Sequence, residues 1–140
     1  MSSTLLGGPA SVDEFQELKI DPDLREFWSV ARSADLFKDE KFGQWGLKIL
    51  SPEQAKLETE KQIRERPLDF SEADLVIGTF YGDSDLLVMT HCKGRNDFEI
   101  IVSTPLDSRE VWASIASSFS DFLAHLSAVE GDKYWERRDF

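Results

Sequence analysis

Two histidines and a single cysteine are the side chains of this chain best suited to nucleophilic chemistry. His91 and Cys92 are neighbours in sequence, but adjacent residues on a strand point to opposite faces of a sheet. A nucleophile and its base must instead lie within hydrogen-bonding reach of each other. His125 falls off the apolar stripe of the helix expected around it, which predicts an exposed or edge position. The sequence therefore predicts no catalytic residues, and we classify the chain as a non-enzyme.

Metal and cofactor sites are also not predicted. One cysteine and two histidines are too few for a structural zinc site. The segment Asp83-Ser84-Asp85 begins like a calcium-binding loop, but no glutamate follows at the twelfth position, and Lys93 and Arg95 add positive charge nearby. Gly78 and Gly82 precede no helix, as a phosphate-binding loop would require. We expect no metal and no cofactor.

The charge of the chain is strongly acidic. Its 140 residues include 16 basic and 27 acidic side chains, for a formal net charge of -11. Such a surface repels nucleic acid and anionic membranes, and attracts a basic protein partner. Solubility alone would also explain the charge, so both interpretations stay open. The lone Cys92 and the absence of a basic and apolar leader predict a reducing, cytoplasmic location.

The central elements are predicted to be a β-hairpin. Apolar runs at Leu75 to Phe80 and Leu86 to Met89 flank a short connection containing glycine, aspartate and serine. Both arms are apolar with little alternation, which favours strands inside a sheet with a helix on at least one face. A third strand is expected at Phe98 to Val102, and a shorter one within Trp45 to Leu50.

Four helices are expected around these strands. Ser11 and Asp21 are predicted to begin two short helices, and Ser51 begins a polar helix that ends at Arg66, before a proline. The last and longest helix is predicted from Val111 to Val129, because apolar residues recur there at helical spacing. Phe119 and Phe122 are expected to pack against the hairpin. Helices, then strands, then a helix indicate an α+β fold with a mixed, mostly antiparallel sheet.

The order of these elements resembles the SUKH superfamily, which includes a fungal cell-wall assembly regulator and bacterial immunity proteins. The resemblance covers roughly residues 11 to 130 and implies a sheet flanked by helices, with no catalytic residues to carry over. We expect residues 1–10 to be flexible, residues 11–131 to form a single domain, and residues 132–140 to form a charged tail. The resemblance rests on these segments: Ile20-Asp21-Pro22 before Leu24, Phe27 and Trp28; Gly43 and Gly46 before Leu47 to Leu50; Leu75 to Gly78 with Gly82 to Met89; and Ala116 to Leu123.

The resemblance implies a function in binding, since family members act by binding other proteins and bacterial members neutralise toxins, often nucleases. We expect a monomer or weak dimer that binds a basic toxin domain, with no nucleic acid or membrane partner. The alternative is a cellular scaffold or regulator that binds endogenous partners. The hairpin turn and the acidic segment before it are the predicted contact face, although turn carboxylates also commonly cap their own backbone. The predicted contact residues are Tyr81, Asp83, Asp85, Asp69, Glu72 and Asp74.

Overall fold

The computed structural model describes residues 2–39, 46–81, 84–92 and 97–128. Within these residues, seven strands form one sheet in the order β1-β2-β3-β4-β5-β6-β7, and each described pairing is antiparallel. The strands are β1 (Ser2–Leu6), β2 (Ala34–Asp39), β3 (Leu47–Ile49), β4 (Asp74–Phe80), β5 (Leu86–His91), β6 (Phe98–Ser103) and β7 (Ala113–Ala116). The α+β class and the central hairpin, here β4 and β5, are confirmed.

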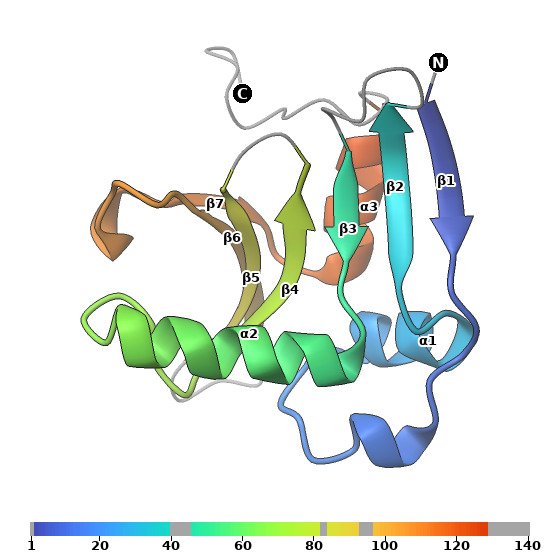
Figure 1. The fold of residues 1–140 in the computed structure, drawn as a ribbon, viewed down its shortest axis with the longest axis horizontal. Helices are drawn as coiled ribbons and strands as arrows, with labels where there is room; N and C mark the ends of the chain where they lie inside the picture. Colours follow the sequence, from blue (N-terminus) through green and yellow to red (C-terminus); the bar gives the residue numbers. More distant parts are fainter. Residues whose placement is uncertain (1, 40–45, 82–83, 93–96, 129–140) are drawn as a thin grey trace.

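Helices lie on both sides of this sheet (Figure 1). In that view α2 crosses in front of the lower ends of β4 and β5, α3 lies behind the sheet, and α1 lies below it. The α-helices are α1 (Pro22–Val30), α2 (Pro52–Glu65) and α3 (Phe119–Ala128), and the 3-10 turns are η1 (Val12–Glu14) and η2 (Arg109–Val111). The sheet is therefore covered by helices, as the apolar hairpin predicts.

The starts of α1 and α2 follow from their sequences. The Asp21 side chain accepts a hydrogen bond from the Leu24 backbone N–H, and Pro22 takes the first helical position, where no N–H partner is needed. At α2, Ser51 and Gln54 form the reciprocal bonds of a capping box. These two predicted helix starts are confirmed.

The edge of β4 is completed by a side chain of α2. Strand β3 pairs only with the second half of β4, and the β4–β5 register shifts between Val76 and Gly78. The Val76 backbone N–H instead donates to the Thr59 hydroxyl over 2.8 Å, and that hydroxyl donates to the Ala55 carbonyl oxygen over 2.7 Å. An unpaired buried N–H would be costly, so the buried Thr59 stabilises β4 where a strand neighbour is missing.

The long final helix predicted from Val111 to Val129 is wrong. Residues 109–128 form η2, then β7 at the edge of the sheet, and only then α3. Ser118 begins α3, because its hydroxyl accepts the Asp121 N–H and its carbonyl accepts the Phe122 N–H. Ile115 of β7 and Phe119, Phe122 and Leu126 of α3 are all buried in the same core. Their combined spacing therefore resembles that of one continuous helix.

The start of the chain contains two strands that the sequence analysis did not predict. Ser2–Leu6 form β1, which pairs with β2. The flexibility expected for residues 1–10 stays a prediction. Ala34–Asp39 form β2, which the charged sequence did not predict. The helix expected from Ser11 is a single 3-10 turn. Gly43, Gly131 and the tail at 132–140 lie outside the described residues.

The core is one continuous cluster of buried residues from the sheet and from α1, α2 and α3, with Ala55 as the α2 member. Trp28 is fully buried and donates from its indole N–H to the Leu50 carbonyl over 3.0 Å. Phe119 and Phe122 are also fully buried, and the Phe119 ring lies 5.3 Å from the Phe27 ring of α1. Their burial is confirmed, but α3 packs mainly on α1 and β7, whereas the sequence predicted packing on the hairpin. Across the described residues, no helix is both long enough and apolar enough to span a membrane.

Candidate protein-contact surface

The predicted contact residues at the far end of β4 do not form one free face. The Tyr81 hydroxyl donates to the Asp35 carboxylate of β2, so this ring joins two strands of the sheet. Burial is the largest cause that raises the pKa of Tyr81, to about 12, and the Asp35 carboxylate adds to it. Asp85 is half-buried at the entrance to β5, and Asp83 lies outside the described residues. Tyr81 is thus a packing residue at this end of the sheet.

The other three predicted residues lie at the opposite end of β4. A strand rises about 3.3 Å per residue, so the seven residues of β4 separate Asp74 from Tyr81 by roughly 20 Å. Glu72 is exposed, Asp69 is half-buried, and the Asp74 side chain is fully buried. Tyr81 and Asp74 therefore lie at opposite ends of the strand.

Asp74 forms a bidentate ion pair with Arg109. The two guanidinium nitrogens of Arg109 donate to the two carboxylate oxygens over 2.5 and 2.8 Å, in the fork geometry typical of strong arginine–carboxylate pairs. Arg109 also donates to the Asp69 carbonyl over 2.7 Å, and its own backbone N–H donates to the Asp69 carboxylate over 3.1 Å. The hydrogen bonds that Arg109 donates to the Asp74 carboxylate are the largest cause that raises the pKa of Arg109, which keeps this side chain charged.

Arg66 makes a second set of contacts between the same segments. Its guanidinium donates to the Asp107 carbonyl over 2.7 Å and to the Asp69 carboxylate over 3.1 Å. Weaker contacts reach the Ser103 hydroxyl and the Thr104 carbonyl at 3.5 and 3.4 Å. The residue that ends α2 therefore holds the loop after β6 against the loop before β4.

Trp112 lies between the two arginines. The guanidinium carbons of Arg66 and Arg109 lie 5.4 and 5.5 Å from the centre of its ring system, within the range of cation–π attraction. Phe70 lies 5.0 Å from Trp112, and the indole N–H donates to the Asp107 carbonyl over 3.1 Å. Two cations, two carboxylates and two aromatic rings thus form a compact connection between the loops.

This network supports two loops with the same tripeptide. Pro67-Leu68-Asp69 follows α2, and Pro105-Leu106-Asp107 follows β6. Leu68 and Leu106 are each 97 % exposed, more than any other large apolar side chain of the described residues, and Val111 is 63 % exposed. We call residues 66–69 together with 104–111 the paired-loop surface.

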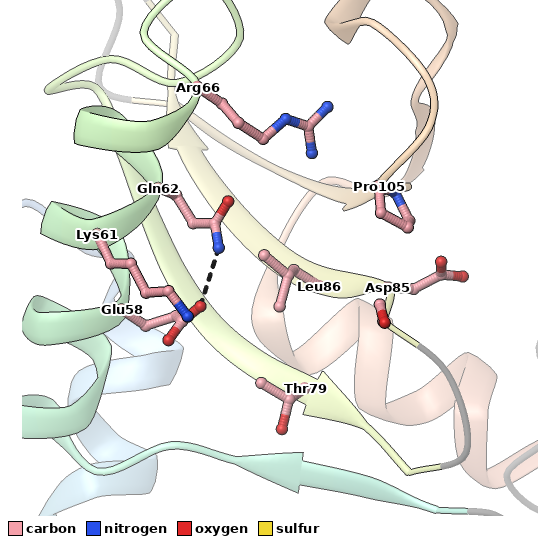
Figure 2. Close-up of a pocket in the computed structure, with 9 residues that line it drawn as sticks. Glu58, Lys61, Gln62, Arg66, Thr79, Asp85, Leu86 and Pro105 are labelled. Carbon is pink, nitrogen blue, oxygen red and sulfur yellow. Dashed lines mark hydrogen bonds between the residues drawn. The ribbon is translucent and has the colours of Figure 1, made fainter.

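A shallow groove adjoins the paired-loop surface (Figure 2). Its volume is about 320 Å³. The side of α2 forms one wall, Leu86 and Thr79 lie on the strands beneath, and Arg66 and Pro105 belong to the paired-loop surface. Within the wall, the Gln62 amide donates to the Glu58 carboxylate over 3.0 Å. Asp85 also lines the groove, so this one predicted contact residue lies near both loops.

Metal-ligating side chains do not gather anywhere in the described part of the chain. No group of three or more histidine, cysteine, aspartate or glutamate side chains there is arranged to hold an ion. The His91 ring lies edge-on to the Phe98 ring with 5.1 Å between their centres. The exposed His125 has its Nδ1 3.0 Å from the Asp121 carbonyl oxygen of its own helix, which accepts a hydrogen bond when Nδ1 is protonated.

The sequence analysis missed both arginines and both leucines of the paired-loop surface. The arginines join residues 35 to 41 positions apart, which no local pattern predicts. One signal was available, because Pro-Leu-Asp occurs twice. Proline fixes one backbone angle, and aspartate forms turns, so each tripeptide predicts an ordered turn with its leucine at the tip.

The fold and this surface define a class of protein. It is an α+β domain in which a network of charged side chains connects two loops, and these loops expose leucines at the paired-loop surface. A comparison with protein-family models matched residues 10–125 to the SMI1 / KNR4 family (SUKH-1), and the chain belongs to this family. Comparisons with curated proteins and with solved structures gave no match.

Proposed function

We propose that this chain is a non-catalytic, cytoplasmic binding domain that neutralises a cognate bacterial toxin by direct contact. The observation that supports this most is family membership over residues 10–125. The SUKH superfamily, which the sequence resembles, includes bacterial immunity proteins. The proposal names a protein partner and no cofactor.

The charge of the chain indicates which class of toxin it would bind. A net charge of -11 complements a basic domain, and nucleases carry basic surfaces because they bind a polyanion. Complementary charge raises association rates from about 10⁵–10⁶ toward 10⁸–10⁹ M⁻¹s⁻¹ at low salt. Rapid capture suits a protein that must bind a toxin before the toxin reaches its substrate.

The experiment begins with the gene next to this one. Where it encodes a secreted protein, the C-terminal domain of that protein, the candidate toxin domain, is co-expressed with this chain. We expect the toxin domain alone to stop growth and the co-expressed chain to restore it, with the two proteins eluting as one complex from a sizing column. A Val30→Ser variant, altered at an exposed position on α1, is the matched control and should protect as well as wild type.

The alternative function gives a different result. A scaffold or regulator of endogenous partners would neither bind that toxin domain nor restore growth. Binding without restored growth would also reject neutralisation, because the active surface of the toxin would then remain open.

A further inference from the structure

Two loops that lie 38 residues apart in sequence meet in space and present the same side chain. Each contains Pro-Leu-Asp, and each leucine is 97 % exposed. We propose that the paired-loop surface is the contact site for the basic partner protein, which buries Leu68 and Leu106 and places basic side chains beside the surrounding carboxylates. This inference rests on the proposed function and names the site through which it acts.

The leucines are exposed by an ordered scaffold. Single exposed apolar side chains are common and need no explanation. Here, however, Arg66 joins the segment carrying Leu68 to the Asp107 carbonyl, and Arg109 joins the segment carrying Leu106 to Asp69. The two loops that carry the leucines are therefore held together by hydrogen bonds of partly buried arginines.

This order favours binding. Association costs free energy for every loop or side chain that must be immobilised, and preorganised loops avoid much of that cost. Pro67 and Pro105 restrict the backbone next to each leucine, and the two arginines hold the loops together. A partner that covers both leucines therefore gains apolar burial without first ordering the backbone.

The charges around the leucines select a basic partner. Glu65, Asp107 and Glu110 are exposed on these segments, with the exposed bases Arg64 on the same segment and Lys61 at the adjoining groove. Arg66 and Arg109 already face carboxylates, so their charge is largely neutralised. The rim is thus acidic around an apolar centre, the arrangement typical of a protein interface.

A second copy of this chain fits the site poorly. Two copies, each with a net charge of -11, would bring their acidic rims together and repel each other. An anionic membrane is repelled for the same reason. The adjoining groove extends the candidate contact area toward Asp85.

The test measures binding to the candidate toxin domain encoded by the neighbouring gene, in a variant of that domain that no longer stops growth, so that it can be purified. Isothermal calorimetry compares wild type with Leu68→Ser, Leu106→Ser and the double variant. Burying one leucine is worth about 1.5–3 kcal/mol, and each 1.4 kcal/mol is tenfold in Kd. We therefore expect each single variant to weaken binding at least tenfold and the double variant about a hundredfold or more.

The control is Val30→Ser, which makes the same change of an exposed aliphatic side chain (68 % exposed) at a distant helix end. Its Kd should equal that of wild type. If wild type binds and the double variant binds within twofold of it, the surface is wrong while the proposed function stands. If wild type does not bind, the proposed function is wrong.

Sedimentation of the chain alone tests whether a second copy of this chain, rather than a partner protein, covers the paired-loop surface. Wild type should sediment as the same species as the double variant at micromolar concentration. A wild-type dimer that becomes a monomer in the double variant would assign the surface to a second copy and overturn the proposal. Circular dichroism of each variant, with an unchanged thermal midpoint, excludes misfolding as the cause of weaker binding.

Discussion

The junction of α1 and α3 and the paired-loop surface use the same kinds of residue in opposite ways. At the junction, Phe119 and Phe122 are buried, and the buried Asp21 carboxylate accepts the N–H groups of Leu24 and Phe119, at the starts of both helices. At the paired-loop surface, Arg66, Arg109 and Asp69 are partly buried in hydrogen bonds and ion pairs, and both leucines point to solvent.

This difference separates stability from binding. Apolar burial is the main favourable term in folding, so an arrangement with leucine outside and arginine–carboxylate pairs inside does little for stability. The burial of apolar side chains at the junction is explained by the stability of the fold alone. The exposed leucines of the paired-loop surface are better explained by a partner protein that buries them.

Phe119→Ala should have the largest effect on stability. The ring is fully buried against Phe27, and phenylalanine-to-alanine changes in a core typically cost about 3–5 kcal/mol. Urea denaturation should show a clear drop in the midpoint. A midpoint within a few per cent of wild type would mean that α3 does not form the core described here. Leu68→Ala, at an exposed position, is the control and should leave the midpoint unchanged.

Arg109→Met should come next. It leaves the buried Asp74 carboxylate without its cation, and breaking a buried pair in this way costs about 3–5 kcal/mol. The lower end is expected, because the Arg109 side chain is 34 % exposed. Adding Asp74→Asn to Arg109→Met removes the unpaired charge and should restore part of the loss. No recovery in the double variant would show that Arg109 acts through packing on Trp112 rather than through the pair.

Asp21→Asn should have a smaller effect with a distinctive pH dependence. An amide offers one acceptor oxygen instead of two, so the Leu24 or the Phe119 N–H loses its partner at a cost of about 1–3 kcal/mol. Asp23→Asn, which alters a more exposed cap of the Ser120 N–H, is the control and should cost less.

The sign of the pH dependence follows from burial, which is the largest cause and raises the pKa of Asp21 above its ordinary value of 3.8. Ionisation of Asp21 therefore opposes folding, and the stability that its protonated form contributes is present below pH 3.8 and lost as the pH rises through the folded pKa. The stability difference between wild type and Asp21→Asn should shrink over this range. A difference that grows with pH would contradict the assigned shift.

Loss of the hydrogen bond between Tyr81 and Asp35 should change the alkaline titration of Tyr81 more than it changes the free energy of unfolding. Its pKa of about 12 means that it ionises well after an ordinary tyrosine in an alkaline absorbance titration. Asp35→Asn removes the carboxylate that adds to the shift and should lower this pKa. Identical titration curves for the two proteins would exclude the bond between Tyr81 and Asp35.

The smallest stability effect is expected at the leucines themselves. Leu68→Ser and Leu106→Ser alter side chains that are 97 % exposed, so each should change the free energy of unfolding by no more than about 0.5 kcal/mol. Thermal denaturation of the double variant checks this. A large loss would mean that these leucines serve the fold, which would remove the contrast between the two regions.

The sequence predicted the parts of the fold that local chemistry determines. The caps at Asp21 and Ser51 and the apolar arms of the hairpin act over a few residues, and each was confirmed. β7 was missed because Ala113–Ala116 carries no strand pattern of its own and becomes a strand by pairing with β6. β1 depends in the same way on its pairing with β2.

The candidate site was less predictable for the same reason. Asp69 and Asp74 were chosen from the sequence as exposed contacts, but Arg66 and Arg109 reach them, and Arg109 comes from a segment 35 to 40 residues away. Such long-range pairs decide which carboxylates remain accessible. The repeated Pro-Leu-Asp tripeptide is the part of the site that the sequence could have indicated.

Amide hydrogen exchange of the chain, with and without the toxin domain, tests the central claim most directly. We expect bound toxin to slow exchange at Leu68, Asp69, Leu106 and Asp107 while leaving the end of α1 around Val30 unchanged. Slowed exchange elsewhere on the chain, with the two Pro-Leu-Asp loops exchanging as they do in the free protein, would contradict the account.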